Sequence, residues 1–362
     1  MDYIFINAYT NFNLGDDLFV KILCERYPQN RFILFAPKRY KITFKNNNNL
    51  IILPQDNLVV RTVNFLSRKT NMRKFSFQNL ISNRCKAVVH IGGSIFMEDE
   101  GWRKRLKRKQ ELRKLKQPYF VLGSNFGPYK DKSYLENHKE IFKSYTDICF
   151  REKYSYSLFE DLENVRWADD VVFQLESNNS NVEYLNIAIS VIKPSFRKNL
   201  RGYDDIYYTK IKEIAMYFMD KGYQVTLMSF CEKEGDREAI DEIVGLLPSK
   251  YKDEVIKHYY QTNMNASLKV IENSDFVIAT RFHSMILGWV YEKPVFPIVY
   301  SNKMYNVMEG TKFTGKSTNF VDIASLAASE VYETMNTNLV DVSQQIKNSE
   351  NQFKQLDSYL LK

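Results

Sequence analysis

The sequence has no C-x-x-C pair and no clustered histidines, which are the usual marks of a metal site or a redox centre. Its cysteines and histidines are few and far apart: Cys24, Cys85, Cys149 and Cys231, and His90, His138, His258 and His283. This spacing argues against structural zinc and against a disulfide framework. We therefore predict reduced cysteines in a cytoplasmic protein and assign no metal.

A targeting segment and a long apolar run are also missing. The first residues, MDYIFINAY, carry an acid at position 2 and only a short apolar stretch, so neither a signal peptide nor a transit peptide is evident. No run of about 18 apolar residues occurs, which excludes a membrane-spanning helix. We expect a cytoplasmic location.

A dinucleotide fingerprint is absent as well. Glycines follow apolar runs at Gly92 and Gly93 and again at Gly123 and Gly127. Neither pair has the G-x-G-x-x-G spacing with which a Rossmann turn holds the pyrophosphate of a nicotinamide cofactor. We predict no cofactor.

The charge is biased towards cations, with 51 Lys and Arg against 43 Asp and Glu, a net charge of +8. This excess favours anionic ligands or an anionic surface. The densest basic run, from Arg103 to Lys116, is compatible with a solvated helix face, with attraction to an anionic membrane or a lipid pyrophosphate, and with nucleic acid. No RNA-binding pattern or zinc finger supports the last, so we predict no nucleic-acid partner. Peripheral contact with the inner face of the cell membrane stays open for this run.

What the sequence does contain is a regular alternation of apolar runs and helical patterns. This alternation predicts parallel sheets covered by helices on both faces. The composition shifts between Glu176 and Glu183, and a second series of the same kind begins at Leu185. We predict an α/β fold of two Rossmann-like domains, residues 1–180 and 184–325, with sheets facing a central cleft. For the C-terminal helical segment, residues 326–362, packing on the first domain is one possibility. The predicted strands are Tyr3 to Asn7, Phe32 to Phe35, Leu50 to Leu53, Ala87 to Ile91, Tyr119 to Leu122, Ile148 to Phe150, Leu185 to Ser190, Gln224 to Met228, Val255 to Ile256, Phe276 to Ala279 and Pro294 to Ile298.

The segment from Thr280 to Met308 carries the clearest chemical pattern. Arg281 and His283 fall where a buried strand gives way to a helical pattern. Free amides of a first helical turn, together with an Arg and a His, suggest a pocket for phosphate or carboxylate. A structural explanation, in which His283 packs at the turn and Arg281 pairs with an acid, fits this segment equally well.

Further candidate side chains follow the predicted strands of the first half, where a doubly wound sheet binds its ligands. In the first loop Gly15 permits a tight turn, and Asp16 is either a helix cap or a general acid or base. Gly92, Gly93, Ser94 and Asn125 occupy two later loops.

Arg151 follows another predicted strand and is placed to clamp an anion bidentately. Its structural alternative is a salt bridge to Glu152 or Asp147. Asp169 and Asp170 are adjacent in an extended segment and point to opposite faces, so they do not form a metal pair. More simply, one of them orients Arg151 or caps a turn.

In the second half, the loop from Ser229 to Asp236 is again a strand-end loop. Lys303, which follows a strand and a short turn, supplies a point charge for a phosphate or is an ordinary surface lysine.

In their order and spacing, these motifs resemble the polysaccharide pyruvyl transferase family over about residues 5 to 310. The motifs are Asn13-Leu14-Gly15-Asp16-Asp17, Gly92-Gly93-Ser94, Gly127-Pro128, Arg151-Glu152 with Ser155, Ser229-Phe230 with Gly235-Asp236, Arg281-Phe282-His283, and Tyr300 with Lys303.

The resemblance implies a GT-B-like pair of domains and transfer of a pyruvyl group from phosphoenolpyruvate to a glycan acceptor, lipid-linked or free. It implies that Arg151 and His283 meet the donor, and we add Arg281, Lys303 and Ser229 to that set. We assign acid–base roles to His283, Asp16 and Asp17. The acceptor is assigned to the first domain, with Asn13, Gly15, Gly92, Gly93, Ser94, Asn125 and Asp169 as cleft residues, and the donor to the second.

The sequence departs from the family pattern at two positions. Ser94 stands where the family often has a third glycine, and Asp170 stands where a proline often follows the acid. The second departure weakens any role transferred to Asp169. Two other functions stay open: a GT-B glycosyltransferase that uses a nucleotide sugar, and a non-catalytic protein that binds a glycan or a membrane through its basic run.

Overall fold

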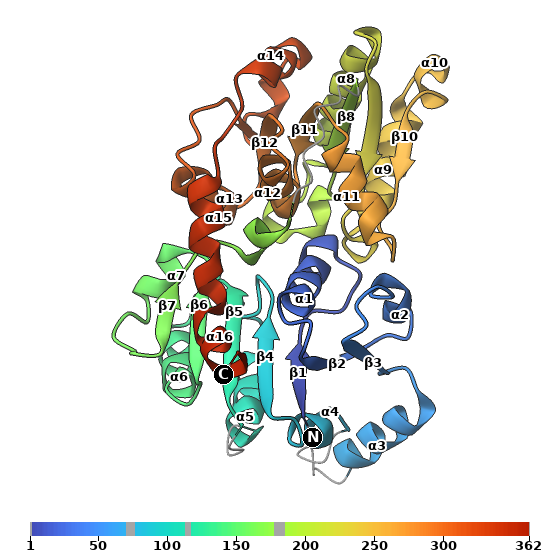
Figure 1. Cartoon of the computed structure of the whole chain (residues 1–362). Coiled ribbons are helices and arrows are strands. Elements are labelled where there is room, and N and C mark those ends of the chain that lie inside the picture. The colour runs from blue at the N-terminus through green and yellow to red at the C-terminus, as the bar shows by residue number, and fades with distance from the viewer. Residues whose placement is uncertain (1, 70–76, 113–116, 177–184, 362) are drawn as a thin grey trace. The chain divides into compact units, whose positions relative to one another are not determined.

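The computed structural model describes residues 2–69, 77–112, 117–176 and 185–361 (Figure 1). The chain forms two compact units. Unit 1 comprises Met1–Thr10, Asp16–Gln174 and Ile346–Lys362, and unit 2 comprises Asn11–Gly15 and Leu175–Gln345. The predicted boundary between residues 180 and 184 lies outside the described residues, and the segment 326–362 contributes to both units.

Unit 1 is built on a seven-stranded parallel sheet with the order β3-β2-β1-β4-β5-β6-β7. Its strands are continuous apolar runs because helices cover a parallel sheet on both faces. In the register, Ile4 of β1 lies between Phe32 of β2 and Ala87 of β4. The strands are β1 Tyr3–Asn7, β2 Arg31–Ala36, β3 Leu50–Pro54, β4 Ala87–Ile91, β5 Tyr119–Ser124, β6 Asp147–Phe150 and β7 Val165–Trp167.

Among the described residues, helices α1 to α7 connect these strands, and α15 and α16 follow near the end of the chain. One core cluster of unit 1 is strongly aromatic, with Phe96, Phe126, Phe142 and Phe150 packed together. The connecting helices are α1 Leu14–Arg26, α2 Tyr40–Thr43, α3 Leu58–Lys69, α4 Phe77–Ser82, α5 Trp102–Leu112, α6 Lys132–Phe142 and α7 Lys153–Ser157; the closing helices are α15 Ser343–Ser349 and α16 Lys354–Leu360.

The last residues of the chain are held against unit 1 by polar contacts. Asp357 of α16 accepts hydrogen bonds from Arg26 at 2.6 Å and from Tyr27 at 2.7 Å. The buried amide of Gln352 accepts from the backbone N–H of Gly123 and donates to the carbonyl of Phe150. Through Gln352, the C-terminal segment therefore hydrogen-bonds to the carboxyl ends of β5 and β6.

Unit 2 is built on a six-stranded parallel sheet with the order β10-β9-β8-β11-β12-β13. Its core lies between this sheet and its helices and includes Ile187, Ile211, Phe218 and Ile278. The strands are β8 Asn186–Ser190, β9 Gln224–Met228, β10 Ile256–His258, β11 Phe276–Ala279, β12 Val295–Val299 and β13 Thr318–Asn319. The helices are α8 Asp204–Asp220, α9 Asp236–Leu246, α10 Ser249–Lys252, α11 Met264–Glu272, α12 Phe282–Val290, α13 Asn302–Gly310 and α14 Ala328–Glu333.

The predicted alternation of strands and helices is confirmed in both units. Each predicted strand is present, with ends that differ by up to two residues, and the structure adds the short edge strands β7 and β13. All four cysteines are buried and free. Burial raises the pKa of the Cys24 and Cys149 thiols, which makes them poor nucleophiles.

The described ranges contain neither a membrane-spanning helix nor a metal-binding cluster. None of their helices has both the length and the apolar character needed to cross a bilayer. Nor do the described His, Cys, Asp and Glu side chains gather in a group of three or more suited to a metal ion.

Candidate functional site

The polar side chains singled out from the sequence lie at or near the carboxyl ends of strands, and those of β1, β4 and β11 border the topological switch points of the two sheets. In unit 1, the chain adds β2 and β3 on one side of β1 and then β4 to β7 on the other side. This reversal of strand order predicts a ligand-binding crevice between the carboxyl ends of β1 and β4. In unit 2 the equivalent crevice lies between β8 and β11. Loops at such crevices are where open α/β sheets bind ligands.

Arg281 follows β11 and is the centre of a buried ion-pair network in unit 2. Its guanidinium pairs with Glu234 at 2.5 Å and with Asp236. Asp236 also accepts hydrogen bonds from the backbone N–H groups of Phe230 and Cys231, both at 2.9 Å. Two carboxylates therefore neutralise Arg281, which is the structural alternative considered for this residue. The main effect of Arg281 is to hold the loop after β9 in place through these two acids.

Arg197, in the loop after β8, joins the same network from the other side of the crevice. It pairs with Glu234 at 3.0 Å, and its guanidinium lies 4.7 Å from the centre of the Tyr300 ring. Its Nη1 is buried and has no hydrogen-bond partner among the described residues. Buried donors are normally satisfied, so this atom is suited to an anionic ligand.

Lys303 brings a third cation from the first turn of α13. Its Nζ lies 5.0 Å from the Phe282 ring centre and 5.6 Å from the Tyr300 ring centre. Burial acts to raise the pKa of Tyr300, but the positive charges of Lys303, Arg197 and Arg281 outweigh it and lower that pKa below its usual value. The lowered pKa of Tyr300 therefore indicates a positive electrostatic potential at this end of the sheet.

His283 lies in the first turn of α12, with its ring edge-to-face against Phe282 at 5.0 Å. The ring packs directly on Gly15: a Cβ added to that glycine would lie 1.8 Å from His283 Nδ1. Only a residue without a side chain fits there. The segment Asn11–Gly15, which follows β1 in the chain, therefore forms part of the His283 environment in unit 2.

Asn13 ties this segment to the ion-pair network. Its side chain accepts a hydrogen bond from the Gly15 N–H at 3.1 Å and donates to Glu234 at 3.4 Å. The Leu14 N–H donates to the Phe230 carbonyl at 2.9 Å. Asn13 and Gly15 thus contribute to the same cluster as Arg281 and His283.

Ser229 does not line this cluster. Its side chain is fully buried and accepts a hydrogen bond from the Tyr260 N–H at 3.0 Å. The expected donor contact of Ser229 stays a prediction, and in the structure this first residue after β9 is buried in the fold. Its role is to join β9 to the loop after β10.

Arg151 lies in unit 1, where its side chain is buried and held by hydrogen bonds. Its Nη1 pairs with Asp170 at 2.9 Å, and its Nη2 donates to the Asn125 side chain at 2.8 Å. A Cβ on Gly93 would lie 2.6 Å from Arg151 Nη1, so the guanidinium packs on the Gly93 backbone. The ion pair of Arg151 is thus with Asp170, one of the two acids considered for orienting it, in place of the salt bridge suggested with Glu152 or Asp147.

Glu152 and Asp147 contact other side chains, and Asp147 lies at the opposite end of β6 from Arg151. Glu152 accepts from Ser155 Oγ at 2.6 Å, and Asp147 pairs with Arg166 at 2.7 Å. Asp170 fulfils both functions expected of one acid of its pair, because it orients Arg151 and also caps the turn at Val172.

The glycine loop after β4 is joined to the loop after β5. Ser94 Oγ donates to Asn125 at 3.2 Å, and the Asn125 N–H donates to the Gly93 carbonyl at 2.9 Å. Gly92 has a φ of +149° and lies near Asp16: a Cβ on Gly92 would lie 3.9 Å from Asp16 Oδ1. Asp16, Gly92, Gly93, Ser94, Asn125 and Arg151 therefore form one cluster in unit 1.

The two acids at the start of α1 differ in exposure. Asp17 is buried and accepts a hydrogen bond from Tyr40 at 2.9 Å, and its assignment as an acid–base residue stays a prediction. Adjacent residues of a helix point about 100° apart, and this rotation turns Asp17 into the fold while Asp16 stays partly exposed. Asp169, in contrast, is held by Asn348 at 2.8 Å, and burial raises the pKa of its carboxyl.

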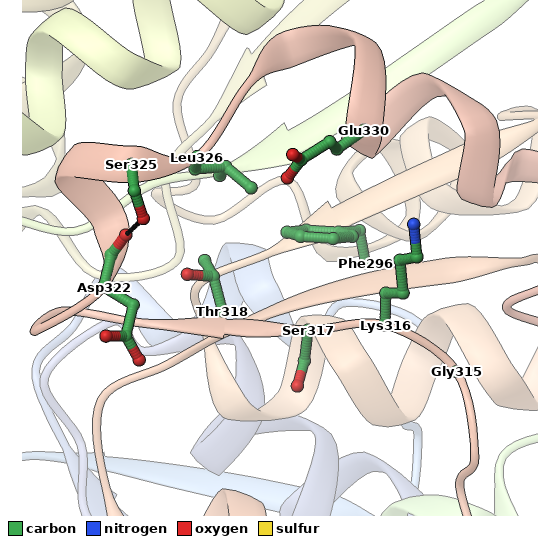
Figure 2. Close-up of a pocket in the computed structure, with 9 residues that line it drawn as sticks. All are labelled: Phe296, Gly315, Lys316, Ser317, Thr318, Asp322, Ser325, Leu326 and Glu330. Carbon is green, nitrogen blue, oxygen red and sulfur yellow. Dashed lines mark hydrogen bonds between the residues drawn. The ribbon is translucent and has the colours of Figure 1, made fainter.

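A separate hollow of about 380 Å³ lies in unit 2 beside β12 and β13 (Figure 2). Figure 2 shows Lys316 and Glu330 near the Phe296 ring, and Asp322 farther away, where its backbone carbonyl accepts a hydrogen bond from Ser325. None of the site residues named above lines this hollow. We therefore do not include it in the candidate site.

Sequence reasoning missed Arg197, Glu234 and Gln352. Arg197 was detectable, because the rule that ligands bind after strands applies to β8 as it does to β11. Glu234 lies in the strand-end loop from Ser229 to Asp236 but was not singled out there, and Gln352 gave no local signal, since its partner Gly123 lies 229 residues away.

Comparison with solved structures defines the class of the fold as GT-B-like. Neisseria meningitidis UDP-GlcNAc 2-epimerase bound to UDP-GlcNAc has a TM-score of 0.59 at 10% identity, covering 100% of both chains. Anabaena HepE in complex with UDP and glucose has a TM-score of 0.58 at 10% identity, covering 99% of both chains. Staphylococcus aureus MnaA with UDP has a TM-score of 0.57 at 13% identity, covering 99% of this chain and 97% of that one.

The family follows from the sequence itself. The family model of polysaccharide pyruvyl transferase matches residues 13–302. The chain therefore belongs to the polysaccharide pyruvyl transferase family, as its motifs suggested. The match begins at Asn13 and ends one residue before Lys303, so it includes most of both clusters.

Proposed function

We propose that this transferase moves the pyruvyl group of phosphoenolpyruvate onto two hydroxyls of a sugar in a surface polysaccharide or its precursor. The products are a pyruvate ketal and inorganic phosphate. The observation that carries the proposal is the group of Arg197, Lys303 and His283 around the neutralised Arg281 in unit 2. Phosphoenolpyruvate bears a phosphate and a carboxylate, and both need cations and helix amides of this kind.

The reaction balances without a cofactor. A proton adds to the methylene carbon of phosphoenolpyruvate, and a sugar hydroxyl attacks the adjacent carbon with loss of its own proton. The bond between that carbon and the bridging oxygen then breaks, and phosphate leaves. A second hydroxyl attacks the same carbon, loses its proton and closes the ketal.

The side chains suggest a division of labour for these steps. Lys303 and the unsatisfied Nη1 of Arg197 bind the anionic groups of the donor, and His283 transfers the proton to carbon or contacts the phosphate. Arg281 keeps Glu234 and Asp236 in place. Asp16, the residue after Gly15, takes a hydroxyl proton, and Arg151 orients Asn125 and the glycine loop.

A nucleotide-sugar glycosyltransferase is the second candidate, because three similar folds are recorded with UDP or a UDP-sugar. The same cations would suit a diphosphate. Titration calorimetry with phosphoenolpyruvate and with UDP-sugars separates the candidates. Binding of phosphoenolpyruvate is expected, and binding of UDP-sugars alone would overturn the pyruvyl-transfer assignment.

The role of Arg197 is tested in the same calorimeter. Arg197→Gln is expected to weaken phosphoenolpyruvate binding about 10- to 100-fold, because a charge-assisted hydrogen bond contributes about 1.5–3 kcal/mol. Lys198→Gln is the matched control, since Lys198 is the exposed neighbour and should bind as the wild type does. Equal loss in both variants would argue for a general charge effect instead of a contact.

A further inference from the structure

Unit 1 carries an amphipathic helix whose apolar stripe faces solvent. Leu58, Phe65 and Leu66 of α3 are 77%, 62% and 52% exposed, and their spacing of seven and eight residues places them on one side of the helix. Val60 is buried, and α3 packs on α4. Figure 1 shows both helices at the end of unit 1 from which β1 starts.

Isolated exposed apolar side chains are common, but three large ones aligned on one helix are not. The same stripe contains Arg61 and Thr62, both exposed. A helix with a strong apolar side, basic residues and low mean hydropathy is typical of elements that lie at a membrane interface.

The charge of the chain is concentrated in the same part of the sequence. Residues 58–116 contain 16 Lys and Arg and 4 Asp and Glu, a net charge of +12, whereas the rest of the chain has 35 against 39, a net charge of −4. Basic segments gain free energy at the anionic surface of a membrane. The positive charge of the protein is therefore concentrated in this part of the sequence.

Helix α5 presents part of this charge to solvent. Its side chains Arg103, Lys104, Arg105 and Lys107 are exposed, while Trp102 and Leu106 are buried. Two ion pairs, Arg103 with Asp131 and Arg105 with Asp99, reduce the local charge without cancelling it. In Figure 1, α5 lies at the same end of unit 1 as α3 and α4. Residues 113–116 of the basic run lie outside the described residues.

We propose that this end of unit 1 docks on an anionic lipid bilayer. The stripe of Leu58, Phe65 and Leu66 enters the boundary between headgroups and acyl chains, and the exposed basic side chains of α3 and α5 meet the acidic headgroups. These basic side chains are Arg61, Arg103, Lys104, Arg105 and Lys107. The inference does not depend on pyruvyl transfer, since it concerns a surface outside both clusters.

A lipid surface explains the two features together, whereas a second copy of the chain does not. Pairing of two such surfaces would place one strongly basic segment against another, and like charges repel across an interface. A flat anionic bilayer is complementary in charge and also accepts a narrow apolar stripe.

The test is co-sedimentation of the full chain with phosphatidylcholine vesicles, with and without phosphatidylglycerol. Binding is expected only when phosphatidylglycerol is present. Phe65→Ser with Leu66→Ser should weaken it at least about tenfold, because both apolar side chains leave the bilayer. Lys104→Gln with Lys107→Gln should weaken it about fivefold per charge at low salt.

Val321→Ser with Leu339→Ser is the matched control, since these side chains of unit 2 are also well exposed. It should bind vesicles as the wild type does, and circular dichroism should show all variants folded. Equal binding to both vesicle types, or full binding by the α3 variant, would overturn the proposal. So would a dimer in light scattering that the α3 variant abolishes while vesicles do not bind.

Discussion

At the scale of single residues, the contact between Gly15 and His283 is the most restrictive feature of the site. A Cβ at position 15 would overlap Nδ1 of His283 at 1.8 Å, so any side chain there moves the ring. Gly15 thus belongs to the site through steric fit and not through backbone strain, since no positive φ is found at this glycine.

Gly15→Ala should therefore displace His283 and reduce turnover about 10²-fold, as expected when an acid–base group is misplaced. The chain has only four histidines, so the His283 ring signals can be followed by NMR. They should shift in this variant. Gly245→Ala is the control, because nothing lies within 4 Å of its added Cβ. Unchanged ring signals and full activity in Gly15→Ala would contradict the contact.

The carboxylate of Glu234 gives a pH-dependent prediction. Burial acts to raise its pKa, but Arg281, Arg197 and Lys303 outweigh burial and hold that pKa below its ordinary value of 4.5. A lowered folded pKa means that the group stabilises the fold above pH 4.5, and that this stability is lost as the pH falls further, through the folded pKa.

Glu234→Gln should lower the free energy of unfolding by about 1–3 kcal/mol at neutral pH. The difference from wild type should shrink when urea unfolding is repeated below pH 4.5. A difference that is constant across this range would show that the charge of Glu234 is not what stabilises the loop.

At the scale of elements, the strands and the strand-end loops were predictable because buried parallel strands are continuous apolar runs. The partners of charged residues were not. Arg151 has Glu152 beside it in sequence and Asp147 at the start of the preceding strand, yet it pairs with Asp170, which the turn after β7 brings to the strand end. The spacing of apolar runs in the sequence predicts where a loop lies. The pairing of a carboxylate with a guanidinium depends on tertiary packing, which the spacing does not give.

Gln352 shows the same limit, since a polar residue in a C-terminal helix gives no sign that it closes a sheet. Its amide accepts from Gly123 and donates to Phe150, Ala168 and Asp169. Gln352→Ala should leave several of these buried backbone groups unsatisfied, at about 1–3 kcal/mol for each. Urea unfolding measures the loss, and Ser358→Ala, on the exposed side of α16, should cost much less. Equal stability of the two variants would contradict a clamping role for Gln352.

At the scale of the whole molecule, the chain order and the structural units differ. Unit 1 takes its last segment from the end of the chain, and Asn11–Gly15 belong to unit 2 although unit 1 residues flank them. A composition shift in the sequence indicates where one α/β series ends. It does not indicate that short segments of the chain belong to the other unit.

Ending the chain after Gln345 should therefore destabilise unit 1 while unit 2 keeps its own core. The truncation removes Asp357 from Arg26 and Gln352 from β5 and β6. Hydrogen exchange should show faster exchange in β5 and β6 and little change in β8 and β11. Equal loss of protection in both sheets would mean that the units do not unfold separately.

The central claim, pyruvyl transfer from phosphoenolpyruvate, is tested most directly with donor labelled by oxygen-18 at the oxygen that bridges carbon and phosphorus. The protein is incubated with this donor and candidate glycans, and mass spectrometry follows both the phosphate and the sugar. The account predicts that the label leaves with inorganic phosphate while the sugar gains one pyruvyl ketal. Label retained in free pyruvate, with no gain in mass on any sugar, would contradict it.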